Sequence, residues 1–332
     1  MVAVSLGAGS RGVAQSVRAP VSIDTVPPRT VIETPFAFQS GTLTLPGTLT
    51  LPATQSRQKI PVALIVAGSG PTDRNGNSAG ALRAQNNSNL YAILAWQLAN
   101  TGIASLRYDK RVIGDNLQKI DVAKTSIDDF IADAIAGARI LFVDKRFSKV
   151  ILIGHSEGAE LVLQAANRGA PVTGIVMLSG AGRPIMPVLR EQISRQLPPA
   201  ELVKWDSASA RYLRGEDPGD VHPGLRSLLL PVNRLFMQTW AKYDPVTEIK
   251  RVKVPVLIVQ GGLDIQVTEA DARALKAADP AAQLLVIPTA NHVFRAAASQ
   301  DRLLQLRLYT DPTIPIVPEL TPAIVEWVKK LK

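Results

Sequence analysis

The fold of this chain is decided by the stretch VILIGHSEG at residues 150–158. The apolar residues predict a buried strand, and a helical pattern begins at Ala159. Gly154 and Gly158 flank Ser156, so we expect a sharp strand-to-helix turn that lifts the serine hydroxyl above the carboxyl edge of a sheet. A glycine-rich turn with a capping serine is the plain alternative for so short a pattern. The strand before the pattern and the helix after it favour the sharp turn.

Strands and helices alternate along most of the 332 residues. Short apolar runs bounded by turn residues are typical of parallel strands that are buried on both faces. Such runs occur at residues 62–66, 103–108, 150–153, 174–178, 256–259 and 284–287. Helical patterns, with apolar residues three and four apart, occur at residues 90–99, 127–143, 159–167 and 321–331. The alternation predicts an α/β fold with a doubly wound, mostly parallel sheet and helices on both sides.

The beginning of the chain does not follow this alternation. Residues 18–35 are rich in proline and β-branched residues, which predicts an extended lead-in. In residues 42–52 threonine and leucine alternate around Pro46-Gly47, which predicts a short hairpin with its turn at that pair. Residues 1–16 lack the basic start and firm apolar centre of a complete signal peptide, but a clipped remnant stays open. The expected location is therefore the cytoplasm, or the periplasm or exterior if such a remnant is present.

A long segment between Gly182 and Val254 contains no strand-like run. Its helical patterns lie around residues 188–196, 201–213 and 225–240. A long insertion between two strands of a sheet is usually a lid or a functional loop, so we predict a helical lid here. Apolar residues of the lid are candidates for substrate binding, although packing inside the lid explains them equally well: Leu228, Leu229, Phe236 and Trp240.

A serine that attacks an acyl carbon needs a base, and the base needs an orienting acid. Only three histidines are available. His292 and Asp264 each follow a predicted strand, so both are expected at the carboxyl edge where Ser156 emerges. His155 lies inside the turn, where its side chain should point away from the hydroxyl, and His222 lies in the lid. Capping of the next helix is the alternative role for Asp264.

A developing oxyanion needs amide donors aimed at it. The amide of Glu157 lies at the start of the predicted helix and is one candidate. The other is the amide of Ser69, in the turn AGSGP at residues 67–71 that follows an early strand. A plain loop and a phosphate cradle are the alternatives for this turn, but the G-K-[ST] of a phosphate-binding loop does not follow.

The composition excludes several classes of protein. The chain has no cysteine, which removes disulfides, thiol catalysis and thiolate metal sites, and three histidines argue against a histidine-rich metal site. We therefore expect no cofactor and no metal. The net charge of +9 comes without a run of five like charges and without interleaved aromatic residues, so the expected partner is a small molecule and not a nucleic acid. No apolar run approaches the roughly 18 residues of a membrane-spanning helix.

These features divide the chain into three parts. They do not predict the oligomeric state. The predicted parts are a lead-in at residues 1–30, a core at residues 31–182 and 255–332, and the lid at residues 183–254.

Four segments resemble bacterial α/β hydrolases near the dienelactone-hydrolase and S9/S33 peptidase-like group. They are AGSGPTDRNGN at 67–77, LRYDKR at 106–111, GHSEG at 154–158, and Asn291-His292. The resemblance reaches from about Gly41 to the carboxyl end, apart from the insertion. It implies an α/β-hydrolase fold and esterase or acyl-hydrolase activity, with Ser156, Asp264 and His292 at the triad positions in that order.

Two positions depart from the family pattern. The early motif more often begins with histidine, where this chain has Ala67, but the amide donor survives that change. In the family, a glycine more often follows Arg111 directly, whereas this chain reads Val112-Ile113-Gly114. We expect this difference to alter the wall of the site.

Cleavage of a carboxylic ester through an acyl-enzyme on Ser156 is the leading interpretation. Two other activities stay open on the same fold. One is an acyl thioesterase, and the other is an aminopeptidase-like serine peptidase with Glu201, Glu216 or Asp217 as the anchor for a substrate's amino terminus. A non-catalytic ligand-binding protein is the alternative from another class, and the intact serine, acid and base argue against it.

Overall fold

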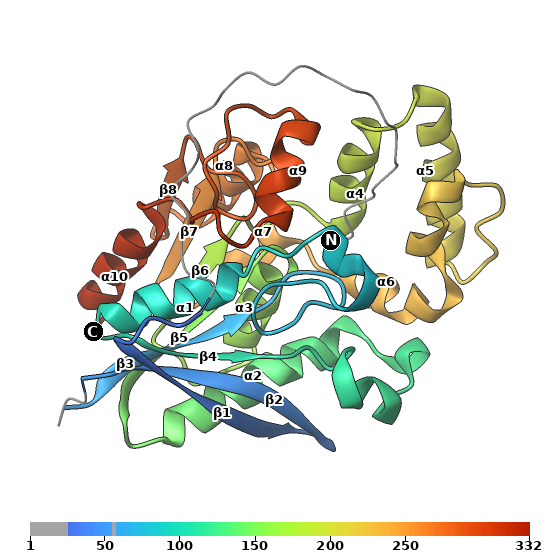
Figure 1. The fold of residues 1–332 in the computed structure, drawn as a ribbon. Coiled ribbons are helices and arrows are strands. Elements are labelled where there is room, and N and C mark those ends of the chain that lie inside the picture. The colour runs from blue at the N-terminus through green and yellow to red at the C-terminus, as the bar shows by residue number, and fades with distance from the viewer. Residues whose placement is uncertain (1–25, 55–57) are drawn as a thin grey trace.

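The computed structural model describes residues 26–54 and 58–332, which form an eight-stranded sheet with helices on both faces (Figure 1). The strand order across the sheet is β1-β2-β4-β3-β5-β6-β7-β8. Neighbouring strands from β4 to β8 are parallel, whereas β2 is antiparallel to both β1 and β4. The strands are β1 (Val31–Ser40), β2 (Leu43–Pro52), β3 (Ile60–Val66), β4 (Ala104–Tyr108), β5 (Phe147–His155), β6 (Gly174–Leu178), β7 (Val256–Gly261) and β8 (Gln283–Ile287). All six predicted parallel strands are confirmed.

Alternation along β3 shows why the sheet is covered on both faces. Val62 and Leu64 belong to one buried core, which α2, α3 and α8 complete, and Ala63 and Ile65 belong to a second, which α1 and α10 complete. The core helices are α1 (Leu90–Asn100), α2 (Ile127–Val143), α3 (Glu157–Asn167), α8 (Glu269–Ala278), α9 (Arg302–Thr310) and α10 (Leu320–Lys330), with 3-10 turns η1 (Gly80–Ala84), η2 (Gly114–Lys119) and η3 (Val122–Lys124). The predicted fold class is confirmed.

The predicted hairpin turn at Pro46-Gly47 is wrong. β2 runs without a break from Leu43 to Pro52, and the turn lies earlier, at Gly41, where φ is +58°. Gly47 is needed for a different reason, because a Cβ there would lie 2.5 Å from the Arg107 carbonyl oxygen and 2.8 Å from that of Phe36. A close approach of flanking strands and a turn both demand glycine, so the dipeptide alone does not distinguish them. The last residues of the extended stretch predicted at 18–35 form the start of β1, and residues 1–25 lie outside the described residues.

The insertion is helical, as predicted, and α4, α5 and α6 lie together at one end of the sheet (Figure 1). Residues 225–240 are not one helix, because Pro231 lacks an amide hydrogen and interrupts the segment. The elements are α4 (Ile185–Ser194), α5 (Pro199–Leu213), η4 (Pro223–Leu229), η5 (Pro231–Asn233), α6 (Arg234–Trp240) and α7 (Pro245–Ile249). The boundaries of lead-in, core and lid stay predictions.

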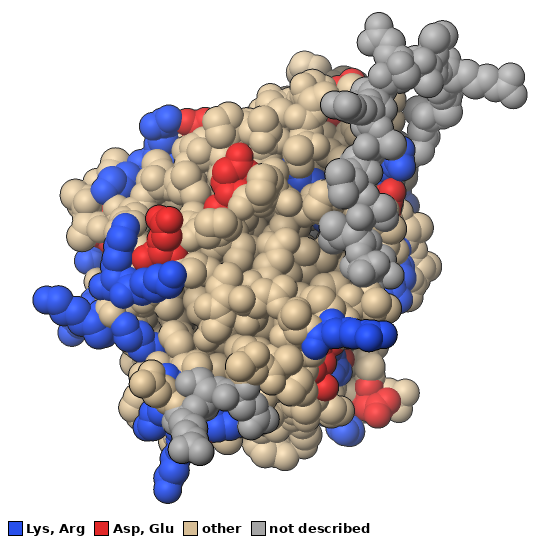
Figure 2. Space-filling model, turned by 60° about the vertical axis from the view of Figure 1, so that its left-hand side comes forward, with Lys and Arg blue, Asp and Glu red and all other residues tan. Residues whose placement is uncertain are grey.

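Surface charge is scattered on the face that Figure 2 draws. Lys and Arg lie mainly around its rim, interspersed with Asp and Glu, and the middle of that face carries neither. Within residues 26–54 and 58–332, no helix combines the length and apolar character needed to cross a membrane.

Candidate active site

Ser156 occupies a strained position between β5 and α3. Its φ is +57°, a conformation that side chains other than glycine rarely adopt. The flanking glycines are required by packing, since a Cβ on Gly154 would lie 2.0 Å from the Gly158 carbonyl oxygen. A Cβ on Gly158 would lie 2.3 Å from the Val66 carbonyl oxygen. The amide of Ser156 donates to the Leu178 carbonyl oxygen at 2.8 Å, which anchors the predicted sharp turn to β6.

Asp264 and His292 meet at the carboxyl edge of the sheet. Asp264 follows β7, His292 follows β8, and Asp264 Oδ2 lies 2.7 Å from His292 Nδ1. The other carboxylate oxygen of Asp264 accepts from the amides of Gln266 at 2.7 Å and Val267 at 3.0 Å. Burial alone would raise the pKa of Asp264, but the charge and hydrogen bond of His292 and these amides outweigh it and lower the pKa.

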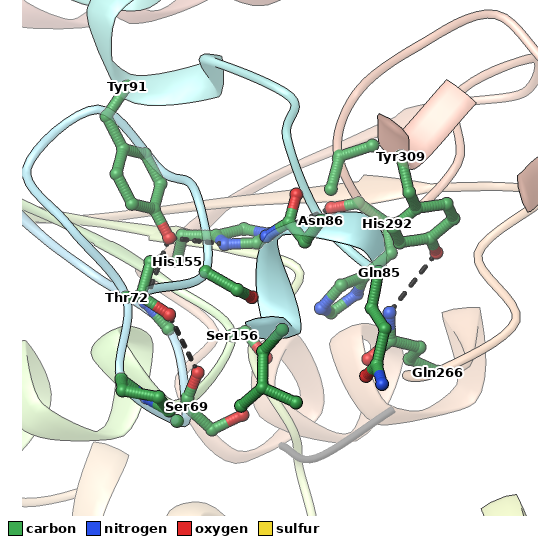
Figure 3. Close-up of a pocket in the computed structure, with 16 residues that line it drawn as sticks. Ser69, Thr72, Gln85, Asn86, Tyr91, His155, Ser156, Gln266, His292 and Tyr309 are labelled. Carbon is green, nitrogen blue, oxygen red and sulfur yellow. Dashed lines mark hydrogen bonds between the residues drawn. The ribbon is translucent and has the colours of Figure 1, made fainter. Parts of the chain in front are cut away.

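The ionised Asp264 fixes the tautomer of His292. A carboxylate only accepts hydrogen bonds, so the proton of a neutral His292 lies on Nδ1 and Nε2 is left free to act as a base. Ser156 and His292 line the same pocket (Figure 3). No hydrogen bond joins the Ser156 hydroxyl to His292 within the described part of the chain, and such bonds often tighten only when substrate binds.

The two segments that carry the candidate oxyanion amides lie next to Ser156. The turn after β3 packs directly on the serine, because a Cβ on Gly68 would lie 3.2 Å from Ser156 Cβ. Ser69, the next residue, lines the pocket together with Ser156. Glu157 begins α3, and neither its amide nor that of Ser69 donates to an acceptor among residues 26–54 and 58–332.

Lys110 joins the two segments that carry these amides. Its Nζ donates to Glu157 Oε1 at 2.7 Å and to the Gly68 carbonyl oxygen at 3.0 Å. Both side chains of the ion pair are buried, and Nζ also lies 4.8 Å from the centre of the Phe130 ring. Lys110 belongs to the segment LRYDKR that carries the family resemblance, but no pattern in the sequence predicted its role.

His155 is hydrogen-bonded to the segments that surround Ser156 and does not serve as the base. Its Nε2 lies 2.8 Å from the His292 carbonyl oxygen, which can only accept, so Nε2 carries the proton. Its Nδ1 therefore accepts from Tyr91 Oη at 2.9 Å, and that hydroxyl accepts from the Gly68 amide at 2.9 Å. Burial, helped by the neighbouring His292, lowers the pKa of His155 to about 3, so the ring stays neutral. His222 lies in the insertion and accepts from the Gly224 amide.

This geometry agrees with a comparison of the sequence with protein families. The sequence profile described as "Alpha/beta hydrolase family" matches residues 64–305. The chain belongs to the α/β hydrolase family.

Similar proteins agree with that assignment. Esterase EstD of Thermotoga maritima is 29% identical over 220 residues, which are 64% of this chain but 48% of EstD, so the chain spans about half of that relative. Est1E from Butyrivibrio proteoclasticus superposes with a TM-score of 0.56 at 18% identity, over 89% of this chain and 98% of Est1E. Dienelactone hydrolase from Anabaena variabilis superposes with a TM-score of 0.52 at 16% identity, over 91% of this chain and 99% of that enzyme. The resemblance that the motifs implied is confirmed, and the two superpositions support the fold.

Two pockets of this α/β hydrolase meet at the turn after β3. The first has the more polar lining of the two and is here called the polar pocket; it has a volume of about 100 Å³ and contains Ser156 and His292 (Figure 3). The second, called the apolar pocket, has a volume of about 270 Å³ and lies under the insertion. Ser69, Gly70 and Pro71 line both pockets.

The apolar pocket contains three of the four residues of the insertion that were predicted for substrate binding. Leu228, Phe236 and Trp240 line it, whereas Leu229 is buried in the hydrophobic core and does not reach it. Val112, at the position where the family pattern more often has glycine, also lines it. Lining residues that no sequence pattern indicated are Leu117, Val122, Phe130, Leu189, Val232 and Met237.

The acidic residues suggested as a peptide anchor line neither of the two pockets of this α/β hydrolase. Glu201 pairs with Lys204, Glu216 pairs with Arg214, and Asp217 accepts from a nearby amide. Among residues 26–54 and 58–332, no group of three or more His, Cys, Asp or Glu is placed to hold a metal ion.

Proposed function

We propose that this protein is a serine hydrolase that cleaves carboxylic esters through an acyl-enzyme on Ser156. The observation that carries the proposal is the 2.7 Å contact between Asp264 and His292 at the wall of the pocket that also contains Ser156. This arrangement leaves Nε2 of His292 as a base within the same pocket as a hydroxyl on a strained turn.

The two halves of the reaction use the same base. Ser156 Oγ forms a bond to the acyl carbon while its proton passes to His292, and the bond to the alcohol oxygen then breaks as His292 returns that proton to it. A water molecule next attacks the acyl carbon and gives a proton to His292. The bond to Ser156 Oγ breaks, the acid leaves, and the serine regains its proton.

The amides of Ser69 and Glu157 are proposed to bind the oxyanion that forms in both halves. Each is free of other acceptors in the described part of the chain and lies next to Ser156. One such donor is worth about 3 kcal/mol of transition-state stabilisation in related chemistry. Lys110 donates to the carbonyl oxygen of Gly68, the residue before Ser69, and to the side chain of Glu157. These two bonds support a role for Lys110 in fixing the distance between the two amides.

The apolar pocket is proposed to bind the acyl chain. Its wall contains Leu228, Phe236 and Trp240, and burying apolar carbon there gains about 0.8 kcal/mol for each methylene group. We therefore expect acyl groups longer than acetyl to react faster until the pocket is filled.

A fluorophosphonate probe and a series of p-nitrophenyl esters test this proposal. The probe should label Ser156, identified by mass spectrometry, and should leave the Ser156→Ala variant unlabelled and inactive. Ester hydrolysis should increase from acetate toward hexanoate. Absence of labelling together with no activity from acetate through octanoate would refute the proposal, and faster turnover of a chromogenic dipeptide than of any ester would identify a peptidase instead.

A further inference from the structure

The two pockets beside Ser156 differ in chemistry, and the mechanism assigns a different part of the ester to each. His292 must deliver a proton to the oxygen of the departing alcohol, so that alcohol has to lie on the wall where His292 lies. That wall belongs to the polar pocket, whereas the apolar pocket contains neither His292 nor Ser156. The alcohol is therefore expected in the polar pocket and the acyl chain in the apolar one.

Hydrogen-bonding side chains surround the site of the departing alcohol. Gln85, Gln266 and Tyr309 line the polar pocket near His292 (Figure 3). Gln266 Nε2 donates to Tyr309 Oη at 3.2 Å, so the hydroxyl acts there as an acceptor. Within residues 26–54 and 58–332, this contact is the one hydrogen bond of the Tyr309 hydroxyl, so its proton has no acceptor there, and Gln266 Oε1 has no donor.

These two groups form a ready donor and acceptor pair for hydroxyl groups. Tyr309 is 8% exposed, and burial raises its pKa, so the phenol keeps its proton for donation. An alkyl alcohol would leave both groups without partners once water is displaced, and unpaired buried polar groups are costly. A polyol would satisfy both, because each hydroxyl donates as well as accepts.

We propose that the enzyme acts on acyl esters of small polyols, with the hydroxyl-bearing alcohol in the polar pocket and the acyl chain in the apolar pocket. This inference rests on the proposed ester hydrolysis. The polar pocket of about 100 Å³ holds several groups the size of water, each of which needs roughly 10–15 Å³, so an alcohol about the size of glycerol fits.

A matched pair of substrates tests the proposal. Glycerol 1-monohexanoate and propyl hexanoate share the acyl chain and the three-carbon alcohol and differ only in two hydroxyl groups. Release of hexanoic acid is followed by pH-stat titration, and each kcat/KM is divided by the alkaline hydrolysis rate of the same ester to remove intrinsic reactivity. The corrected ratio should favour the glycerol ester at least about tenfold, as expected for two hydrogen bonds.

Variants identify the groups responsible. Tyr309→Phe and Gln266→Met should each lower that ratio about three- to tenfold, the value of one hydrogen bond. Because both substrates are measured on one preparation, the ratio does not depend on how much of a variant is folded. Tyr212→Phe is the matched control, since the Tyr212 hydroxyl bonds the Leu230 carbonyl oxygen inside the insertion and lines neither pocket, and it should leave the ratio unchanged.

The outcomes separate this inference from the proposed function. A corrected ratio near one, with p-nitrophenyl hexanoate still cleaved, would overturn the polyol inference and leave ester hydrolysis standing. A high ratio that neither Tyr309→Phe nor Gln266→Met lowers would also overturn it. Failure to cleave any of the three hexanoates would overturn the proposed function itself.

Discussion

We predict that Glu160 makes the stability of this fold depend on pH near neutrality. It lies on α3, one turn after Ser156, and lines a cavity of about 20 Å³ that Ser156 also touches. Its carboxylate accepts from Gln164 Nε2 at 2.8 Å and forms no ion pair among the described residues. Burial, and to a smaller extent the charges of Glu248 and Asp244, raises the pKa of Glu160 to about 7.

The size of the effect follows from this pKa. The ordinary value for glutamate is 4.5, and each pH unit between it and about 7 is worth about 1.4 kcal/mol, so ionising Glu160 costs the folded state about 3 kcal/mol. Because the folded pKa is raised, the folded state binds the proton more tightly than the unfolded state. The stability from this proton is fully present below pH 4.5 and is lost as the pH rises through about 7.

Urea denaturation of wild type and Glu160→Gln between pH 4.5 and 8 measures the effect. Glutamine has nearly the same shape as glutamate but does not ionise. As the pH rises from 4.5 to 8, the free energy of unfolding of the variant should therefore increase by about 3 kcal/mol relative to that of wild type. Glu326→Gln, an exposed position on α10, is the control and should show a constant difference from wild type. A Glu160→Gln difference that stays constant from pH 4.5 to 8 would show that the buried carboxyl does not titrate there, and the reasoning from burial would be wrong.

Two further predictions concern the site. Asp264→Asn should lower kcat for p-nitrophenyl hexanoate roughly 10³- to 10⁴-fold with little change in KM, because an amide at this position can stabilise the wrong tautomer of His292; a loss below tenfold would contradict the assigned role. Lys110→Met leaves the Glu157 carboxylate buried and unpaired, so it should lose about 3–5 kcal/mol in urea denaturation. The double variant with Glu157→Gln should regain most of that loss, and a single variant as stable as wild type would show that the pair is not needed.

The sequence predicted the parallel part of the fold well because burial on both faces produces continuous apolar runs. Each of the runs between residues 62 and 287 is a strand in the structure, and the helical patterns at 90–99, 127–143 and 159–167 are helices. Such patterns are properties of single segments, so they are visible without knowing what each segment contacts.

The antiparallel edge was predicted less well, because there one residue type serves different needs. Gly47 is small because Arg107 and Phe36 approach it from either side, and Arg107 lies sixty residues away in the chain. Nothing local distinguishes this demand from that of a turn. Leu229 could not be placed from its local sequence either. Its apolar side chain would suit a pocket wall, but it packs in the core.

In the candidate site, the residues that the reaction requires could be predicted from the sequence, whereas the residues that position them could not. Ser156, Asp264 and His292 were predicted because nucleophilic catalysis demands these residue types after strands that end at a common edge. The residues that hold these three in place could not be predicted in this way, because the reaction itself does not require particular residue types there.

Gly68 shows what the sequence patterns leave out. Its amide is held by Tyr91 and its carbonyl oxygen by Lys110, while Tyr91 also bonds His155 and Lys110 also bonds Glu157. Four side chains from α1, from the segment after β4 and from the two sides of Ser156 therefore hold the two peptide units that meet at Gly68. The second of these peptide units carries the proposed oxyanion amide of Ser69, so the position of the donor is a tertiary property that no single stretch of the sequence encodes.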